Sequence, residues 1–133
     1  MYSNHNLNDM LEISDNLKSI GINKIIFTGP TPRWTPALPV IVAYRLWEDT
    51  PKKTKLGLDA NILDLDRHLT ENFPQSKEVR YVSIIDSLCD STGCTIYLGD
   101  DKKTGITSID FGHLSFIASI YFVKNNLISE IIK

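Results

Sequence analysis

Residues 24–32 decide the fold class of this chain of 133 residues; they read Lys24-Ile25-Ile26-Phe27-Thr28-Gly29-Pro30-Thr31-Pro32. The first five are mostly apolar and β-branched, which predicts a strand that is buried on both faces. The glycine and the two prolines end the strand, because proline cannot donate to a ladder of hydrogen bonds. Strands buried on both faces are typical of parallel sheets covered by helices, so the sequence predicts an α/β fold.

Two amphipathic helices are predicted around this strand, separated by a short helix over residues 39–47 and a charged loop over 48–55. The first helix ends at Gly21, where a positive φ is easiest for glycine, and Asp9 with Glu12 has the form of a capping box. Apolar residues at helical spacing mark the two helices: Leu7, Met10, Leu11 and Leu17 in the first, and Leu58, Ile62, Leu65, Leu69 and Phe73 in the second.

The rest of the chain supplies one more core strand. The elements predicted after the second helix are a strand over Val79 to Ile85, a turn between Cys89 and Cys94, a small hairpin arm at Ile96-Tyr97-Leu98, and a last helix from Leu114 to Ile131 that is weakened at Asn125-Asn126. Two parallel strands leave sheet edges unpaired and apolar faces uncovered. Either the chain finds more strands elsewhere or it is the C-terminal part of a larger α/β domain, and we favour the second interpretation.

Composition excludes several classes of protein. Hydrophobic residues make up 42% of the chain and charged residues 23%, as in ordinary globular domains, and the length suits one domain or a piece of one. A formal net charge of −2 argues against a nucleic-acid partner and against an anionic membrane surface. The longest mostly apolar run, Phe116 to Val123, is too short to cross a bilayer, and we expect no signal peptide at the start.

The best candidate for a catalytic site is Asp110-Phe111-Gly112-His113-Leu114-Ser115, just before the last predicted helix. An aspartate three residues before a histidine can hold the imidazole Nδ1–H and leave Nε2 free as a general base toward a serine hydroxyl. The alternative is structural: Asp110 caps a turn and His113 only packs. Spacing alone leaves both interpretations open.

With these residues in view, the sequence resembles the SGNH (GDSL-like) hydrolase family, in particular the SGNH domain attached to bacterial acyltransferase-3 membrane proteins that O-acylate cell-surface polysaccharides. Four pieces carry the resemblance in the family's order: the strand and turn at residues 25–32, the second strand from Val79, the pair Cys89 and Cys94, and the Asp-x-x-His-Leu-Ser piece at 110–115. The resemblance implies a partial three-layer α/β/α, flavodoxin-like fold whose parallel sheet lacks its N-terminal strands. Residues 1–133 would then be the C-terminal portion of a single SGNH-like domain.

The resemblance also implies roles for particular residues. His113 would be the catalytic base and Asp110 its orienting acid. The family's nucleophilic serine lies in a Gly-Asp-Ser block, and this tripeptide is absent here; Ser83, Ser87 and Ser115 have no such setting. A base and its orienter without a nucleophile should not run an acyl-enzyme reaction.

Two further residue pairs are candidates for a role. Cys89 and Cys94 would close a small disulfide loop in an oxidising compartment, which the resemblance implies by its periplasmic setting, or they remain reduced thiols. Arg33 and Trp34 follow a strand at the end where α/β sheets bind ligands, so they could line a sugar-binding rim. The alternative, which we favour, is that Trp34 covers the sheet edge and Arg33 is solvated. No metal site is expected, because one Cys-x4-Cys pair lacks further ligands, and His68 is expected to face solvent.

The resemblance therefore implies a fragment of an O-acyltransferase or esterase domain acting on acyl, in particular acetyl, esters of surface polysaccharide. No cofactor is implied. The expected partners are the polysaccharide, an acyl donor and an upstream membrane acyltransferase domain, with the parent protein anchored in the membrane and this domain in the periplasm. The alternatives are an inert truncated product and a non-catalytic polysaccharide-binding module that uses the Trp34 edge.

Overall fold

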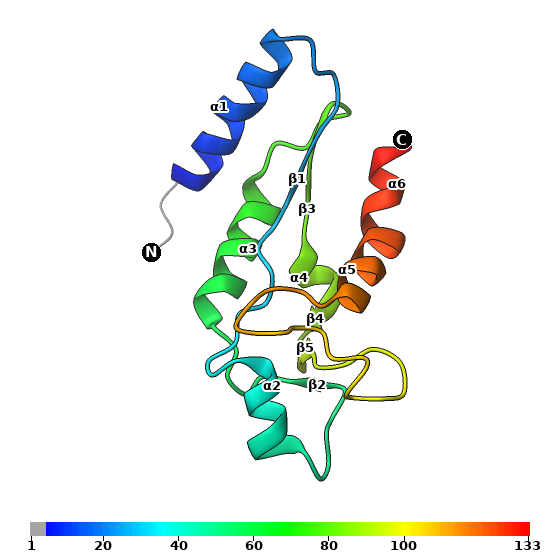
Figure 1. Cartoon of the computed structure of the whole chain (residues 1–133). Helices are drawn as coiled ribbons and strands as arrows, with labels where there is room; N and C mark the ends of the chain where they lie inside the picture. Colours follow the sequence, from blue (N-terminus) through cyan, green and yellow to red (C-terminus); the bar gives the residue numbers. More distant parts are fainter. Residues whose placement is uncertain (1–4) are drawn as a thin grey trace.

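The structure is a computed structural model that describes residues 5–133. Its elements in chain order are α1 (His5–Ser19), β1 (Ile25–Thr28), α2 (Leu38–Ile41), the π-helical turn η1 (Val42–Leu46), β2 (Lys53–Thr54), α3 (Ala60–Asn72), β3 (Val79–Val82), α4 (Ile84–Leu88), β4 (Cys89–Asp90), β5 (Gly93–Thr95), α5 (Phe116–Phe122), the π-helical turn η2 (Val123–Leu127) and α6 (Ile128–Ile131). Helices α5 and α6 run on through η2 as one rod (Figure 1).

A parallel pair of strands forms the centre of the fold. β1 pairs with β3 in a register that places Ile25 opposite Val79 and Thr28 opposite Val82. Helices α1 and α3 cover one face of this pair, and the α5–α6 rod covers the other (Figure 1). The predicted partial α/β/α architecture is confirmed, and in the part of the chain that the structure describes the parallel sheet has these two strands alone.

Each face of the sheet has its own core. On the α1–α3 face the buried side chains are those of Ile25, Leu69, Phe73, Val79 and Tyr81, and apolar residues of α1 pack against them. On the other face, Phe122 of α5 packs with Ile84 and Leu88. On the α1–α3 face the contacts follow from the helical spacing in the sequence, because each amphipathic helix buries its apolar stripe on the sheet.

The second predicted strand is shorter than expected. The strand predicted to reach Ile85 ends at Val82, and Ser83 starts helix α4 by accepting a hydrogen bond from the Asp86 N–H at 2.9 Å. Serine at this position favours a helix start, because its hydroxyl satisfies an N–H that has no partner within the helix. Ile84 and Ile85 are buried in α4, as the predicted strand would also have required, so the apolar run alone could not show where the strand stops.

Two smaller predictions need correction. Asp9 lies within α1, which is helical from His5, so Asp9 and Glu12 do not form a cap at the helix start. The hairpin is formed by β4 and β5 on either side of the Cys89–Cys94 turn, with β2 pairing on the outer side of β5, and it does not include Ile96-Tyr97-Leu98. Tyr97 instead forms an isolated bridge with Ile106.

A second core lies beyond the C-terminal end of the parallel strands, under α2 and the β2–β5–β4 sheet. Its buried members are Trp34, Leu38, Ile41, Val42, Cys94 and Ile96. This core packs the segment after β1 against the β4–β5 hairpin. It therefore positions the loops at the end of the sheet where the candidate site lies.

Candidate functional site

The Asp110–His113 loop is a turn closed by the aspartate itself. One carboxylate oxygen of Asp110, Oδ1, accepts hydrogen bonds from the backbone N–H groups of Gly112 at 2.9 Å and His113 at 2.8 Å. The other oxygen, Oδ2, lies 2.6 Å from Nδ1 of His113. The carboxylate thus holds the imidazole by its Nδ1 edge and leaves Nε2 available.

Asp110 is strongly favoured in its charged form. The backbone N–H groups of Gly112 and His113, followed by the His113 side chain, lower the pKa of Asp110 to about 2. Hydrogen bonds to the carboxylate stabilise the ionised state. The carboxylate therefore stays charged throughout the neutral and mildly acidic range, where it can orient His113 and stabilise an imidazolium.

The proline-rich segment after β1 supports this loop. The Trp34 N–H donates to the Phe111 carbonyl at 2.7 Å, and the Leu38 N–H donates to the Asp110 carbonyl at 3.2 Å. The Thr31 hydroxyl donates to the Gly112 carbonyl at 2.5 Å. Within the loop, the buried hydroxyl of Ser108 lies within hydrogen-bond distance of the carbonyls of Asp110 and His113. The loop is thus held by the segment after β1, which is distant in sequence, and by Ser108, which lies two residues before Asp110.

A hollow of about 510 Å³ opens in front of His113. Its walls are Thr31, Arg33 and Thr35 from the segment after β1 and residues 110–113 from the loop. The His113 side chain is 84% exposed, so Nε2 is open to a reacting group. Two of the walls, Thr31 and Thr35, were not identified from the sequence, because nothing in a proline-rich turn indicates that it lines a hollow with a histidine that is distant in the sequence.

The three serines considered as nucleophiles are engaged elsewhere. Ser83 donates to Asp66 at 2.6 Å, and Ser87 donates to the Ile84 carbonyl at 2.6 Å. Ser115 caps α5 by accepting from the Ala118 N–H, and its side chain is buried. None of the three lines the hollow in front of His113.

Arg33 and Trp34 have different places in the structure. Arg33 is exposed and lines the hollow next to His113. Trp34 is 1% exposed and belongs to the second core, so the expectation of an indole on a sugar-binding rim is wrong. The ring is drawn inward because burying it removes a large apolar surface from water, which matches the interpretation of Trp34 as a cover for the end of the sheet.

Cys89 and Cys94 face each other across the β4–β5 hairpin, where the structure joins them by a disulfide. Cys94 is fully buried in the second core. Among residues 5–133, no group of three or more His, Cys, Asp or Glu side chains is arranged to hold a metal ion. His68 is not solvent-facing as expected: it is half-buried, and its Nε2 is buried with no hydrogen-bond partner in the described part of the chain.

In protein prepared from an oxidising compartment, Cys89 and Cys94 should be bonded to each other. The chain-entropy estimate for so short a loop is roughly 2 kcal/mol of stabilisation. Intact mass after alkylation, with and without prior reduction, measures the pairing. Two alkylated thiols in the unreduced sample would contradict it. Double replacement by serine should lower the urea midpoint, because it also places a hydroxyl in the second core.

A buried acid lies on the α1–α3 face, close behind the end of β1. Asp66 of α3 is 2% exposed and accepts hydrogen bonds from the Tyr81 hydroxyl at 2.7 Å and the Ser83 hydroxyl at 2.6 Å. Burial raises the pKa of Asp66, although the two hydroxyls lower it in part. Gly29 fits tightly over this group, since an added Cβ would lie 2.2 Å from the Tyr81 hydroxyl oxygen.

This network predicts a pH-dependent difference in stability. Because the folded-state pKa of Asp66 is raised, its contribution is greatest at low pH and is lost as the pH rises through that pKa. Wild-type protein should therefore gain stability relative to Asp66→Asn when the pH is lowered from 7 to 4. Asp66→Ala should cost about 1–3 kcal/mol, because it leaves buried hydroxyls unpaired. Urea midpoints from tryptophan fluorescence measure both effects, and an Asp66→Asn difference that is the same at both pH values would contradict the assignment.

The α/β scaffold carries the Asp110–His113 pair at the C-terminal end of its parallel strands, and comparison with solved structures confirms the resemblance seen in the sequence. The chain is similar to the periplasmic domain of a lipopolysaccharide acetyltransferase from Salmonella ser. Paratyphi A, with 30% sequence identity and a TM-score of 0.77. The match covers 93% of this chain and 48% of that one, so this chain spans about half the length of its structural neighbour.

Other comparisons add no family or relative. No protein-family model and no curated protein sequence matches the chain. Within residues 5–133, none of the helices combines the length and the apolar character that crossing a bilayer requires.

Proposed function

We propose that this chain provides the acid–base half of an SGNH-type site that transfers or hydrolyses O-acyl esters, in particular acetyl esters, of a cell-surface polysaccharide in the periplasm. The observation that carries the proposal is the 2.6 Å contact between Asp110 Oδ2 and His113 Nδ1, with the imidazole exposed to the hollow beyond it. The lipopolysaccharide acetyltransferase domain, similar over nearly the whole of this chain, supports the choice of reaction and substrate.

The chemistry assigns one task to each residue. A serine hydroxyl would give its proton to His113 Nε2 as its oxygen attacks the ester carbonyl, which forms a tetrahedral oxyanion. His113 would then pass this proton to the leaving alkoxide, and an acyl-enzyme remains. Asp110 holds Nδ1–H and stabilises the imidazolium at both steps. Transfer of the acyl group to a sugar hydroxyl, or to water, repeats the sequence in reverse.

The nucleophile must come from outside the described part of this chain. Its three candidate serines hydrogen-bond elsewhere, and the hydroxyls in the hollow belong to Thr31 and Thr35, of which Thr31 is bonded to the Gly112 carbonyl. We propose that a further segment, corresponding to the uncovered part of the neighbour, supplies the serine. Arg33, exposed on the wall beside His113, is placed to contact the acceptor polysaccharide.

Mixing this chain with a second polypeptide tests the proposal. The chain is combined with a separate polypeptide that consists of the part of the Salmonella periplasmic domain not covered by this chain, and hydrolysis of a chromogenic acetyl ester is followed. Turnover is expected from the mixture and from neither polypeptide alone. A mixture that assembles without any His113-dependent turnover would overturn the proposal in favour of an inert product.

A polysaccharide-binding module remains the rival function. Buried Trp34 removes the aromatic platform on which it depended. Titration of acetylated and of deacetylated polysaccharide into the isolated chain distinguishes a binding module from an acyl-transfer site. Tight binding that Arg33→Ala abolishes and His113→Ala leaves unchanged would favour the module.

A further inference from the structure

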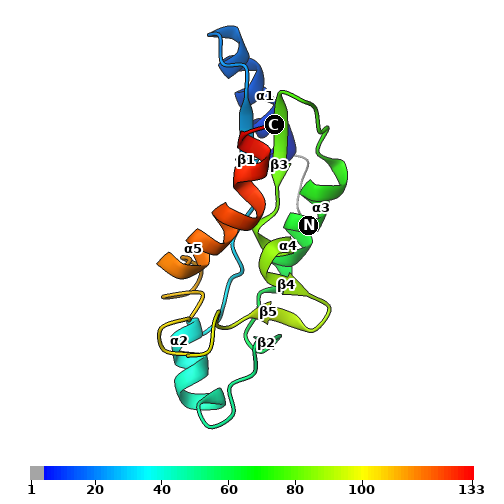
Figure 2. The same ribbon diagram turned by 90° about the vertical axis from the view of Figure 1, so that its right-hand side faces the viewer.

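A second cavity shares Thr35 with the His113 hollow. It is a groove of about 260 Å³ between the segment after β1, the helical stretch α2–η1 and the loop before α3. We call it the Tyr44 groove; its walls include Thr35, Ile41, Tyr44, Arg45, Leu56 and Gly57. Figure 2 shows the loop before α5 next to α2, and the Leu38 N–H of α2 donates to the Asp110 carbonyl at 3.2 Å. The groove is therefore a neighbour of the candidate site.

The floor of the Tyr44 groove is rigidly built. Ile41 is 2% exposed and belongs to the second core. The Thr35 N–H donates to the Gly57 carbonyl at 2.8 Å, which fixes the residue that the two cavities share. Gly57 has a φ of 78°, and a Cβ at this position would clash with the Ile41 side chain. A glycine is thus required for the loop before α3 to lie so close to α2.

The rim of the groove carries apolar side chains that remain in water. Tyr44 is 83% exposed, and Val40 and Leu56 are each more than a third exposed. Ligand sites in proteins are mostly apolar and aromatic hollows with a few polar groups that orient the ligand. An exposed aromatic ring beside a hydroxyl and a guanidinium group, from Thr35 and Arg45, has this composition.

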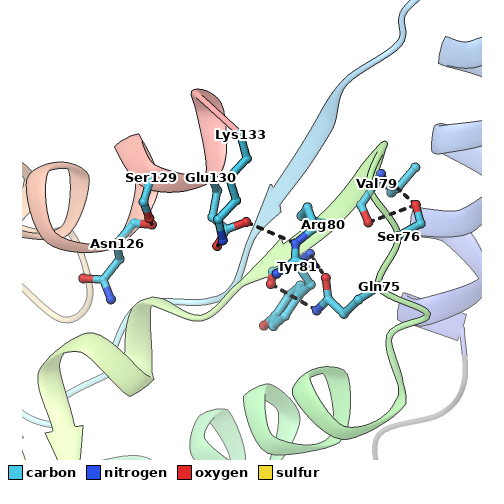
Figure 3. Close-up of polar contacts among 9 residues, drawn as sticks. All are labelled: Gln75, Ser76, Val79, Arg80, Tyr81, Asn126, Ser129, Glu130 and Lys133. Carbon is cyan, nitrogen blue, oxygen red and sulfur yellow. Dashed lines mark hydrogen bonds and ion pairs between the residues drawn. The ribbon is translucent and has the colours of Figure 1, made fainter.

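The arginines of the chain divide into two kinds. Two form ion pairs, Arg67 with Asp64 and Arg80 with Glu130, the second at 3.1 Å (Figure 3). The other two, Arg33 and Arg45, form no ion pair among residues 5–133. Both are exposed, and they line the His113 hollow and the Tyr44 groove respectively. Guanidinium groups bind carboxylates and phosphates in paired hydrogen bonds, so two free ones along one path indicate an anionic ligand.

We propose that the Tyr44 groove binds an acidic sugar residue of the acceptor polysaccharide, next to the residue that is acylated at His113. This inference rests on the proposed function and names the substrate class of that site. One face of the sugar ring lies on Tyr44, and Arg45 binds its carboxylate or phosphate group. The chain of sugars continues past Thr35 and Arg33 into the His113 hollow.

The size and the lining of the groove favour a sugar over a lipid chain. Its volume is below the roughly 300–1,000 Å³ of sites for drug-sized ligands, which suits a single ring. A sugar ring has an apolar C–H face for Tyr44 and a polar rim for Thr35 and Arg45. An alkyl chain would instead remove water from a guanidinium group without replacing its hydrogen bonds.

Probe-observed NMR titration of the full chain tests the groove. The probes are the methyl glycosides of glucuronic and galacturonic acid, each matched with that of glucose or galactose. At low salt at least one uronide should bind about fivefold more tightly than its neutral match, and high salt should reduce the difference. In chain labelled with fluorotyrosine, the fluorine signal of Tyr44, assigned by its loss in Tyr44→Phe, should shift on binding.

Variants assign the two contacts. Tyr44→Ala should weaken binding of all probes by about tenfold, whereas Tyr44→Phe, which keeps the ring, should bind as the wild type does. Arg45→Gln should remove the preference for the uronide and leave binding of the neutral glycoside unchanged. The matched control is Arg67→Gln on the surface of α3, which should change neither.

The results separate the groove from the proposed function. Equal binding of uronides and neutral glycosides would overturn the acidic substrate class, and binding that Tyr44→Ala leaves unchanged would overturn the groove as the site. Loss of the Tyr44 response after mixing with the uncovered part of the Salmonella domain would also overturn it. Tyr44-dependent binding without His113-dependent turnover in that mixture would keep the sugar site and reject the proposed acyl transfer.

Discussion

The isolated chain should show no turnover of a small acetyl ester, and a fluorophosphonate probe should label none of its serines. His113 has an oriented imidazole, but Ser83, Ser87 and Ser115 are held by Asp66, a backbone carbonyl and a helix start. A base without a hydroxyl in reach cannot form an acyl-enzyme. Turnover that His113→Ala abolishes, or a labelled serine identified by mass spectrometry, would contradict this expectation.

In the chain completed with the uncovered part of the Salmonella domain, His113→Ala should lower kcat by on the order of 10³-fold or more. Asp110→Asn should cost less than His113→Ala, since the orienting acid contributes less than the base. Because the pKa of Asp110 is about 2, its own protonation should not limit the rate above roughly pH 4. Asp101→Asn, which changes an exposed carboxylate outside the His113 hollow, is the matched control and should leave kcat unchanged.

The second large effect concerns folding. Alone, the chain should bind a hydrophobic dye, associate at higher concentration and unfold over a broad temperature range. The free β1 edge lies beside apolar side chains left in water, and on the C-terminal rod Phe116 is 82% exposed and Ile132, just beyond α6, 78% exposed. Such surfaces favour association, and a two-stranded sheet is marginal by itself.

Two variants distinguish exposed apolar surface from a weak core as the cause of dye binding and broad unfolding. Ile131→Glu on α6 should reduce dye binding without lowering the melting temperature, because that side chain is 54% exposed. Ile41→Ala in the second core should lower the melting temperature by an amount equivalent to about 2–5 kcal/mol and not reduce dye binding. A monomeric chain with a sharp melt and no dye binding would show that the open edge and the apolar stripes are tolerated.

Most secondary structure could be predicted because its causes are local. The β-branched run before Gly29 forms β1, and the apolar stripes of α1 and α3 have helical spacing. Boundaries were less accurate where a polar residue changes the backbone within an apolar run. Ser83 turns the expected end of β3 into the start of α4, and the hydrophobic pattern is the same in both cases.

The Asp110–His113 pair was visible in the sequence for the same reason. The two residues lie within one turn, so their contact depends on a spacing of three positions. The other wall of the hollow was not predictable in this way. Thr31 and Arg33 reach it because the segment after β1 lies along the loop, and the same packing buries Trp34, which the sequence had left open as a sugar platform.

By itself, the sequence determined most of the elements and the Asp110–His113 contact, because helical spacing, β-branched runs and an i, i+3 contact are encoded by neighbours along the chain. Only the tertiary structure decided which sheet edge is free. Gln75 and Ser76 read as ordinary turn residues, yet their side chains reach the outer backbone groups of β3 and close that edge, while Ile26 and Thr28 have no such cover among residues 5–133. Edge closure depends on where a turn folds back in space, and neither hydropathy nor spacing records that.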